Sequence, residues 1–515
     1  MDNISEIFSS MVFNNNEMKK KLPKAVYKEY LKTIEENKPL DIDLANHMAT
    51  AMKEWAIEKG ATHFTHWFQP LTGITAGKHE SFINIGDNNE VLMEFSGKEL
   101  VKGEPDASSF PSGGLRATFE ARGYTSWDPT SPAFVKDSTL YIPTAFCSYS
   151  GEVLDKKTPL LKSINALNTQ ALKVLDLLGF NDVKKIMVTI GGEQEYFLID
   201  KALFDKRKDL IFCGRTLFGA KAPKGQELED HYFGSIKPRV HEFMKELDNE
   251  LWKLGIPSKT KHNEVAPAQH ELAPIFTDAN IAIDHNQIIM ELMKRIAEKH
   301  NLACLLHEKP FAGLNGSGKH NNWSISTDTG INILDCGSEP EKNILFLVFL
   351  TALIQSVDEY ADLIRVSVSS AGNDHRLGGN EAPPAIVSMF LGDELSSIIE
   401  SIKNGSSYQK IESCYMKSGL NMLHDFKKDT SDRNRTAPIA FTGNKFEFRM
   451  PGSNMSLSGI NIVINTAMAN SLSSFADEIE ALKCEDKSEF EEKLFQIIKT
   501  KLNKHSRVVF DGNCY

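Results

Sequence analysis

Residues 445–450, with the sequence KFEFRM, alternate between charged and apolar side chains. Successive side chains of a β-strand point to opposite faces, so this stretch predicts a strand with one apolar face and one face that carries Lys445, Glu447 and Arg449. Such a charged face either meets solvent, which is common in antiparallel sheets, or lines a polar site inside the protein. The rest of the chain has to decide between these two interpretations.

Composition limits the possible classes of protein. The chain has 515 residues, of which 41% are hydrophobic and 25% charged, as expected for a globular protein with several domains or one large one. A net charge of −11 argues against nucleic-acid binding. The N-terminal stretch lacks signal-peptide features, and the apolar run at 344–354 is shorter than the roughly 20 residues that cross a membrane. We therefore expect no nucleic-acid or membrane partner.

Cysteine usage points to a reducing compartment. Seven cysteines are scattered along the chain, and none forms a CxxC pair. An odd number in a long chain argues against a disulfide framework, and the spacing argues against a thiolate zinc site. A cytoplasmic location is the expectation that fits these features.

The sequence pattern predicts an α+β protein in three parts. Residues 1–60 form a helical arm that stops at Gly60, residues 61–150 a small β-rich domain with long loops, and residues 151–515 a large domain of helices and strands. Within this large domain, helices are predicted over 160–179, 240–255, 284–302 and 342–364. Strands are predicted over 318–327 and over 184–200, the latter as a strand pair or one long bent strand.

Two stretches carry paired carboxylates. In GGEQEYFLID, Glu193 and Glu195 are two apart on a predicted strand and share a face, where their charges repel unless a cation or water intervenes. In KHNEVAPAQHELAP, Glu264 and Glu271 flank Pro267 in a stretch too rich in proline for a helix. Taken singly, each pair is also explained by solvated acids on an edge strand or a surface loop.

A third stretch, FAGLNGSGKHNNWSIS, imitates a nucleotide-binding loop. Residues 313–319 fit GxxxxGK, but His320 stands where a P-loop has Ser or Thr, and NNWSIS predicts a strand where a P-loop opens a helix. We therefore predict a tight glycine loop that delivers His320 into a strand. A lone histidine is more often structural than a metal ligand.

Later stretches add one more acid and a group of cations. The loop RLGGNEAPP contains Arg376 and Glu381, and the stretch before KFEFRM contains Arg433 and Arg435. Together the stretches offer several acids and one histidine on strands or tight loops, followed by cations. Oxygen ligands with one imidazole suit Mg²⁺ or Mn²⁺, and cations beside such a site suit phosphoryl transfer.

These stretches, in this order, resemble the signature blocks of the glutamine synthetase family. The matching blocks are EQEYFLID, NEVAPAQHE, NGSGKH, RLGGNEAPP, RNRTAP and KFEFRMPG. The helical arm, FPSGGLRATFEARGYTSWDP and KHNNWS resemble the type III branch. The resemblance implies a small N-terminal β-grasp-like domain and a large catalytic domain, whose curved antiparallel sheet is flanked by helices and lines a funnel. The charged face of KFEFRM would then look into the funnel.

The resemblance also implies a reaction and a set of roles. L-glutamate, ATP and ammonia would give L-glutamine, ADP and phosphate through a γ-glutamyl phosphate, which must be kept from water.

Two or more Mg²⁺ or Mn²⁺ ions would be bound, one by Glu195, Glu264 and Glu271, and one on the ATP phosphates by Glu193, His320 and Glu447. The substrate glutamate would be bound by Arg376, Arg449, Asn315, Gly316 and Glu264. ATP would be contacted by Ser324, Lys445, Asn322 and Arg435, the last at the γ-phosphate. Arg376, Arg435 and Glu381 would be catalytic, with Glu381 closing over the site and helping to deprotonate ammonium.

Some positions depart from the family pattern. Asn322, Ala440 and Lys445 stand where the best-known bacterial branch has His, Arg and Arg, so one phosphate contact is lost at Ala440. No convincing match exists for the NLYDLP block with its adenylylated tyrosine, which puts that control in doubt. Asp128 and Glu80 are candidates for the acid that the β domain lends to a neighbouring subunit.

Assembly is a further expectation from the resemblance. Subunits of this family close into hexameric rings, and the type III branch stacks two rings, so we expect a homo-oligomer and a double-ring dodecamer. The sequence ends at VVFDGNCY, where type III relatives usually continue into further helices that contribute to oligomer contacts.

Three other functions compete with this interpretation. A ligase that joins glutamate to a polyamine on the same fold would keep the metal and phosphate residues, although Glu381 favours ammonia. A non-catalytic relative need not keep the ligand set that this chain has. A guanidino kinase is related in fold, but the RNRTAP block argues against it.

Overall fold

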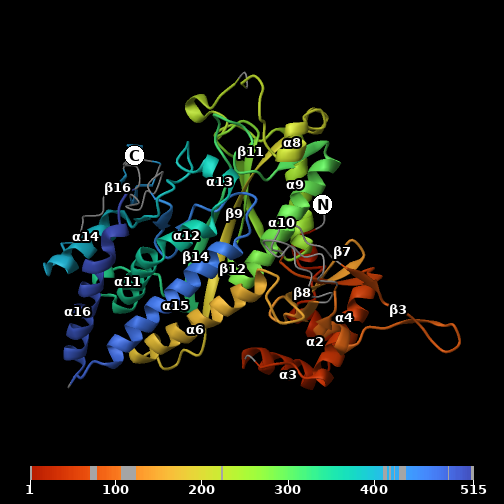
Figure 1. Ribbon diagram of the computed structural model, residues 1–515, viewed down its shortest axis with the longest axis horizontal. Helices are drawn as coiled ribbons and strands as arrows, with labels where there is room; N and C mark the ends of the chain where they lie inside the picture. Colours follow the sequence, from red (N-terminus) through yellow and green to blue (C-terminus); the bar gives the residue numbers. More distant parts are fainter. Residues whose placement is uncertain are drawn as a thin grey trace. The chain divides into compact units, whose positions relative to one another are not determined.

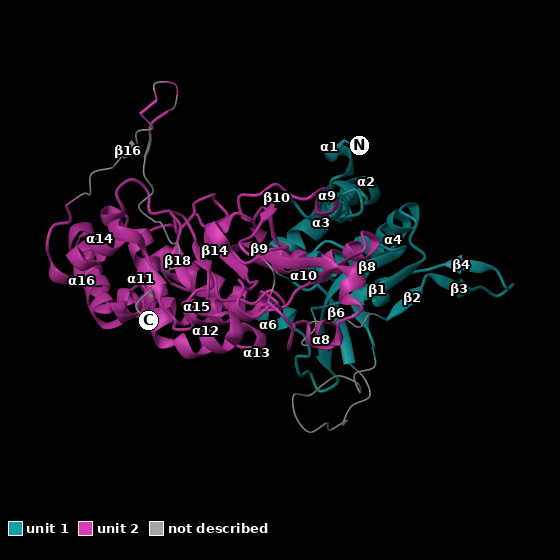
Figure 2. Cartoon of the chain, turned by 90° about the horizontal axis from the view of Figure 1, so that it is seen from above, with its two compact units in different colours: residues 1–161, 242–258, 287–292 teal, residues 162–241, 259–286, 293–515 magenta. Residues whose placement is uncertain are grey.

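A computed structural model describes residues 3–511, except 37, 70–77, 106–122, 222–223, 410–414, 417–418, 421, 423, 428–436 and 485. The chain divides into two units (Figure 2), one of residues 1–161, 242–258 and 287–292 and the other of residues 162–241, 259–286 and 293–515. The first unit contains both the predicted arm and the predicted β-rich domain. The second contains the stretches that carry the acids, His320 and Glu447.

The segment predicted as a helical arm contains four helices. It consists of α1 (Ile4–Ile7), α2 (Asn15–Lys21), α3 (Lys24–Glu35) and α4 (Ile42–Glu58). The side chain of Asp41 caps α4 by accepting a hydrogen bond from the Leu44 N–H at 2.8 Å. Gly60, just past the end of α4, has φ +86°, a conformation that favours glycine. The start and stop signals in the sequence therefore both act as predicted.

A six-stranded sheet follows the arm within the first unit. Its order is β2-β1-β8-β6-β5, with β7 paired to β8. The strands are β1 (His63–Trp67), β2 (His79–Ser81), β5 (Lys102–Gly103), β6 (Gly123–Trp127), β7 (Phe134–Lys136) and β8 (Thr139–Ser148). A separate hairpin joins β3 (Ile83–Ile85) to β4 (Val91–Met93), and α5 spans Gly97–Val101. The arm and this sheet share one apolar core, in which the rings of Phe13 and Trp55 lie 5.3 Å apart.

The acid candidates of the first unit have partners within the chain. Asp128 is buried and forms an ion pair with Lys157 at 3.0 Å, while Glu80 is paired with Lys78. Residues 70–77 and 106–122, which include much of FPSGGLRATFEARGYTSWDP, lie outside the described residues.

The second unit is built on a nine-stranded sheet. Its order is β10-β11-β9-β14-β19-β18-β15, with β12 and β13 also paired to β9. The strands are β9 (Ile186–Asp200), β10 (Ser258–Asn263), β11 (Gln269–Pro274), β12 (Thr277–Asp278), β13 (Leu302–Leu305), β14 (Lys319–Thr327), β15 (Met389–Phe390), β18 (Ile439–Phe441) and β19 (Phe446–Phe448). Strand β9 pairs antiparallel with β11, β12, β13 and β14, and β19 pairs antiparallel with β14 and β18, whereas β15 pairs parallel with β18. The expected α+β class with a mainly antiparallel sheet is confirmed, and 186–200 is one long strand.

One face of this sheet is covered by α15 (Ser458–Glu480). On β14, Asn321 exchanges hydrogen bonds with Asn461 of α15, and the Trp323 indole donates to Asn465 at 3.0 Å. On β19, the ring of Phe448 contacts Trp323 from the same side, with ring centroids 6.2 Å apart. The alternate residues of both strands therefore face the other way. That second face carries the predicted site.

The chain has further helices, which are labelled where there is room (Figure 1). They are α6 (Lys157–Leu177), α7 (Lys201–Phe204), α8 (Lys208–Cys213), α9 (Pro238–Lys253), α10 (Ala279–Lys299), α11 (Ile344–Glu359), α12 (Ala361–Ser367), α13 (Ala371–Arg376), α14 (Gly392–Asn404) and α16 (Lys487–His505). Helices α6 and α15 lie side by side, where Lys173 forms ion pairs with Asp477 and Glu480. A small hairpin joins β16 (Tyr415–Met416) to β17 (Phe426–Lys427).

The single helix predicted over 342–364 is wrong. The segment forms two helices, α11 and α12, bent by 77° about Tyr360. Tyr360 leaves the helical region at φ −121° and ψ 25°, and its hydroxyl accepts a hydrogen bond from Asn470 of α15. This tertiary contact has no counterpart in the local sequence, which lacks Gly or Pro at the break.

The buried apolar helix predicted at 344–354 is confirmed, because Phe346–Val357 of α11 are buried. Among the described residues, no single helix is long and apolar enough to span a membrane. The bent pair of α11 and α12 passes such a test only when the two helices are taken together, on length and composition alone.

Candidate active site

Strand register brings the predicted ligands together on one face of the sheet. In the antiparallel pairs, Glu193 of β9 lies opposite His320 of β14, and Glu195 lies opposite Glu271 of β11. One step further along β14, Asn322 lies opposite Glu447 of β19. Because side chains alternate along each strand, all of these residues project from the face that is turned away from α15.

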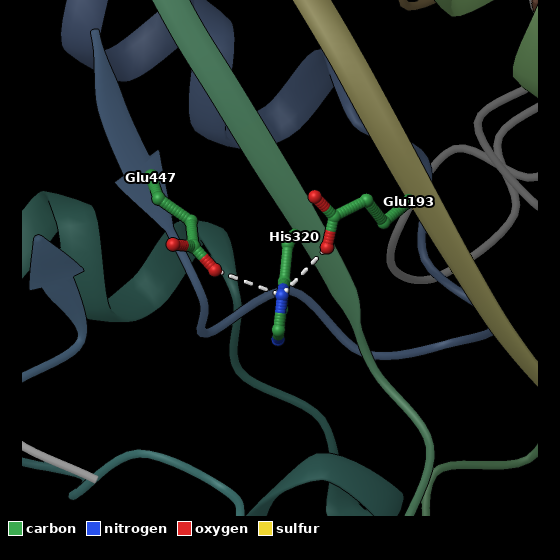
Figure 3. A group of neighbouring side chains, drawn as sticks. All are labelled: Glu193, His320 and Glu447. Carbon is green, nitrogen blue, oxygen red and sulfur yellow. Dashed lines mark ion pairs between the residues drawn. The ribbon is translucent and has the colours of Figure 1, made fainter. Parts of the chain in front are cut away.

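The first group, named here the β14 cluster, consists of Glu193, His320 and Glu447 (Figure 3). The His320 Nδ1 atom lies 2.8 Å from a Glu193 oxygen and 2.9 Å from a Glu447 oxygen. Glu447 is only 2% exposed. The charged face of KFEFRM therefore lines a site, and the solvent interpretation is wrong for Glu447.

Charge and hydrogen bonding fix the β14 cluster. Burial lowers the pKa of His320, but the charges and hydrogen bonds of Glu447 and Glu193 outweigh it and raise the pKa well above its usual value. The Asn322 amide donates to Glu193 at 2.9 Å and to the Gly191 carbonyl at 3.1 Å. Asn322 thus orients a carboxylate of the cluster, whereas the sequence suggested only contact with ATP.

The second group, named here the β10 cluster, consists of His262, Glu264 and Glu271. His262 is on β10, Glu264 follows that strand directly, and Glu271 is on the neighbouring strand β11. The His262 Nε2 atom lies 3.3 Å from a Glu271 oxygen, and Nδ1 lies 3.5 Å from a Glu264 oxygen. Both glutamates are buried, so the interpretation as surface acids is wrong.

The β10 cluster crowds buried carboxyl groups together, and the hydrogen bond with Glu271 raises the pKa of His262 to about 9. Burial, together with the charges of Glu195, Glu271 and Glu381, raises the pKa of Glu264 to about 9. Burial also raises the pKa of Glu271, although His262 opposes this shift. Carboxylates that resist ionisation in this way gain stability when a cation enters. The arrangement therefore favours a bound positive charge.

Both clusters fit a divalent cation. Each offers two carboxylate oxygens and one imidazole nitrogen, and the ligand atoms of each lie within 4.8 Å of one another. This donor set suits Mg²⁺ or Mn²⁺. The β14 cluster has the membership that the sequence suggested for the ATP-side ion.

The β10 cluster differs from the expected set of Glu195, Glu264 and Glu271. Glu195 points one carboxylate oxygen at the Gly318 N–H, at 2.7 Å, and His262 takes its place among the grouped side chains. Sequence reasoning missed His262. The spacing in KHNE could have identified it, because His262 and Glu264 are two residues apart at the end of a strand and so share a face.

Arg376 and the glycine loop pack tightly together. A Cβ atom on Gly316 would lie 2.6 Å from the Arg376 Cγ, and one on Gly318 would lie 2.5 Å from its Nη1, so both positions require glycine. The buried Arg376 guanidinium donates to Asn373 at 2.9 Å and to the carbonyls of Met450 at 2.8 Å and Pro451 at 3.1 Å. The partners observed for Arg376 are thus protein groups, and its contact with substrate stays a prediction.

Asn315 and Glu381 meet beside the β10 cluster. The Glu381 N–H donates to the Asn315 side-chain oxygen at 3.4 Å, and the Asn315 amide donates to Gln269 at 3.2 Å. The Glu381 carboxylate is near enough to Glu264 to raise its pKa. The structure therefore places Glu381, which the sequence predicted to close over the site, beside the β10 cluster.

The predicted nucleotide residues lie toward the other end. The Ser324 hydroxyl donates to the Asn444 carbonyl at 2.9 Å, next to Lys445 in the turn before β19. The Arg449 Nε atom lies 3.6 Å from a Glu447 oxygen. Arg433 and Arg435 lie outside the described residues, so the γ-phosphate role of Arg435 stays a prediction.

Residues 319–327 form strand β14, which confirms that the glycine-rich stretch before them is no P-loop. Lys319, the lysine of the apparent motif, is completely buried and donates to the Asn286 side chain at 2.7 Å. On β18, Ala440 lies directly opposite Glu447 and is buried as well.

Comparisons with known proteins show which family the chain resembles. Residues 4–163 match the family described as glutamine synthetase type III N terminal, and residues 170–394 match the glutamine synthetase catalytic domain. The chain is 51% identical to a type-3 glutamine synthetase of Dictyostelium discoideum over 100% of its own length and 70% of that protein. It is also 51% identical to a glutamine synthetase of Bacteroides fragilis, over 99% of this chain and 70% of that one.

Solved structures show the same fold at low sequence identity. A cryo-electron microscopy structure of Plasmodium falciparum glutamine synthetase superimposes with a TM-score of 0.57 at 17% identity, over 82% of this chain and 75% of that chain. A structure described as a GmaS/ADP complex gives 0.54 at 18% identity, over 82% and 81% of the two chains. These solved structures support the fold. The type III branch is shown by the matched family descriptions and by the relatives at 51% identity. The chain belongs to the glutamine synthetase family, in its type III branch.

Proposed function

We propose that the carboxylate- and histidine-lined face of the nine-stranded sheet is where this glutamate–ammonia ligase joins ammonia to L-glutamate with ATP. One observation carries the proposal: two groups, each with two glutamates and one histidine, lie on one face of one sheet. Glu381 lies near one group and Arg449 near the other. Acids, imidazoles and a guanidinium in this arrangement suit phosphoryl transfer to a carboxylate.

Each cluster would hold one divalent cation, Mg²⁺ or Mn²⁺. Glu193, His320 and Glu447 would hold the ion nearer the ATP phosphates, and Glu264 and Glu271 the ion nearer glutamate and ammonia. Such ions, when bound, neutralise the charge of the phosphates and of the acyl phosphate that forms. In their absence Glu264 resists ionisation, because it is buried among other carboxylates.

The chain's own residues would orient and deprotonate the substrates. Hydroxide is a poor leaving group, so the glutamate γ-carboxylate must first be phosphorylated, and water must be kept away from the product of that step. Asn315, Gly316, Arg376 and Arg449 would bind the amino-acid end of glutamate, with Ser324, Lys445, Asn322 and Arg435 on the nucleotide side. Glu381, held by Asn315, would accept a proton from ammonium.

A glutamate–polyamine ligase is the second candidate. The carboxylate of Glu381 lies near enough to Glu264 to act on its pKa, so this end of the site suits a cation such as ammonium, but a polyamine is also positively charged. The γ-glutamyl hydroxamate assay, run with Mg²⁺ and with Mn²⁺, tests the ligase activity directly. Ammonium should support a much higher kcat/KM than putrescine or ethanolamine. A preference for putrescine would overturn the ammonia assignment, and no hydroxamate with either metal would overturn the proposed site.

Assembly and location complete the proposal. A homo-oligomer of hexameric rings, stacked as a dodecamer, is proposed because the sites of this family use residues from two subunits. Mass measurement by light scattering should give six or twelve chains per particle, and a fully active monomer would contradict it. A cytoplasmic location is proposed on the free state of the cysteines described, Cys147, Cys213, Cys304, Cys336 and Cys484.

A further inference from the structure

Glu308 is a buried carboxylate for which the proposed reaction has no role. It lies just beyond the end of β13, in the stretch HEKP, and is only 4% exposed. Carboxylates are rarely buried unless other groups pair with them or donate hydrogen bonds to them. The groups that surround Glu308 therefore indicate what it holds in place.

Three glycines from separate segments of the chain pack against Glu308. A Cβ atom on Gly452 would lie 2.5 Å from the Glu308 Cγ, and one on Gly372 would lie 2.5 Å from its Oε2. A Cβ atom on Gly316 would meet the Glu308 carbonyl oxygen more closely still. Side chains do not approach one another this closely in a packed interior, so each segment can lie against Glu308 only because it has glycine there.

Hydrogen bonds fasten two of these segments to Glu308 and to each other. The Glu308 carboxylate accepts a hydrogen bond from the Asn454 N–H at 3.0 Å, and its carbonyl accepts one from the Ser317 N–H at 2.9 Å. The Ser317 carbonyl in turn accepts a hydrogen bond from the Ser453 N–H at 3.2 Å. The glycine loop before β14 and the segment after β19 are thereby joined at this one side chain.

The same three segments carry residues that are proposed to bind the substrate glutamate. Asn315 directly precedes the first glycine, α13 ends at Arg376, and Arg449 lies shortly before the last glycine. Burial lowers the pKa of Arg376, and the charges of Glu195 and Glu308 oppose this shift. Glu308 is therefore close enough to Arg376 to act on its charge as well as on its position.

We infer that Glu308 is a positioning residue for glutamate binding. Its side chain fills the space between the three glycines and accepts the hydrogen bond from Asn454, which keeps Asn315, Arg376 and Arg449 in place. The inference rests on the proposed function, because those three residues are proposed to bind glutamate. A residue that acts through such groups should affect glutamate binding more than the chemical step.

Steady-state kinetics of Glu308→Ala test the inference. We expect KM for glutamate to rise by about 10–50-fold, with kcat within about 3-fold of the wild type and KM for ATP unchanged. Glu308→Gln keeps the size of the side chain and an acceptor oxygen, so its KM for glutamate should stay within about 3-fold of the wild type. A wild-type KM in Glu308→Ala, or a Glu308→Gln as impaired as Glu308→Ala, would overturn the inference.

Asp358→Ala on α11 is the matched control for the loss of a buried carboxylate. The Asp358 side chain is 5% exposed and is paired with His505 at 2.8 Å. Its loss should lower the free energy of unfolding and leave KM for glutamate at the wild-type value. An equal rise of KM in Asp358→Ala and Glu308→Ala would show that general destabilisation raises KM, and would overturn the positioning role.

Gly452→Ala gives a second test that does not require Glu308→Ala to fold. The three atoms nearest to the added methyl group all belong to the Glu308 side chain, so this clash alone should raise KM for glutamate. The double variant Glu308→Ala/Gly452→Ala removes the clash, and its KM should be well below the product of the two single increases. A wild-type KM in Gly452→Ala, or independent effects in the double variant, would overturn the inference.

The outcomes separate this inference from the proposed function. Hydroxamate formation by the wild type upholds the enzyme site, and the KM values of the variants then decide the role of Glu308. A wild type that forms no hydroxamate would overturn the proposed function. Calorimetric titration of the wild type and Glu308→Ala with L-glutamate would then decide the role of Glu308, which equal affinities of the two proteins would overturn.

Discussion

The β14 cluster and the β10 cluster contain the same side chains, two glutamates and one histidine, but hold them differently. In the β14 cluster one nitrogen of His320 lies within 2.9 Å of both glutamates, which neutralise a proton on that ring. In the β10 cluster the shortest distance from His262 to a glutamate is 3.3 Å, and Glu195 and Glu381 add further negative charge. In the first group one ring nitrogen bridges both carboxylates, whereas the second group crowds more carboxyl groups around one histidine.

The difference shows how sheet geometry sets the electrostatics of a site. His320 lies directly across from Glu193, and Glu447 comes from the next strand, so one ring can bridge two carboxylates. Across β9 and β11 the register instead places two acids, Glu195 and Glu271, opposite each other. Like charges in this position are destabilising unless a cation intervenes. The β10 cluster should therefore depend more strongly on metal for its stability.

The largest expected effect is on catalysis in the β14 cluster. Glu447→Gln keeps the shape of the side chain and removes its charge. We expect the kcat of the synthetase reaction to fall by about 100-fold or more, which corresponds to about 3 kcal/mol of transition-state stabilisation. Steady-state kinetics with saturating Mg²⁺ measure it. Glu480→Gln, an exposed acid on α15, is the control and should retain full activity. A near-normal kcat for Glu447→Gln would remove the β14 cluster from the reaction.

The next effect is on stability and has opposite signs in the two clusters. In metal-free protein near pH 7, burial keeps Glu264 protonated, which costs free energy relative to the unfolded chain, where the group ionises. Glu264→Gln removes that cost and should raise the free energy of unfolding by about 2 kcal/mol. Glu447→Gln removes a partner of His320 and should lower it by about the same amount. Denaturant titrations in a chelator measure both. Two changes of the same sign would show that the clusters do not differ in charge balance.

The pH dependence of this effect follows from the raised pKa of Glu264. Because its pKa is about 9 in the folded chain and near 4.5 when unfolded, the stability that it contributes is full below pH 4.5 and lost as pH rises toward 9. Metal-free wild type should therefore lose stability over this range more steeply than Glu264→Gln. Equal slopes for the two proteins would contradict the assigned cause.

Sequence reasoning recovered the β14 cluster completely and the β10 cluster only in part. Glu193, His320 and Glu447 all lie within strands whose alternation is visible in the sequence, and the family blocks mark them. His262 lies at the end of a strand whose pairing with β11 depends on long-range register, which local patterns do not encode. The break at Tyr360 was missed for the same reason, since a contact with Asn470 accompanies it.

The smallest expected effect concerns the residue that orients Glu193. Asn322→Ala removes the amide that donates to Glu193 at 2.9 Å, so Mn²⁺ affinity at the β14 cluster should fall by about 10-fold. The β10 cluster should keep its affinity, because Asn322 makes no described contact with it. Calorimetry resolves the two sites. An equal loss at both would show that they are coupled rather than separately held.

Two divalent cations should bind on one face of the nine-stranded sheet, one at the β14 cluster and one beside Glu264 and Glu271. Anomalous diffraction from crystals grown with Mn²⁺ would locate both ions. We predict two peaks, one within bonding distance of Glu193, His320 and Glu447, and one within bonding distance of Glu264 and Glu271. A single peak, or a second peak away from Glu264 and Glu271, would contradict the two-site arrangement.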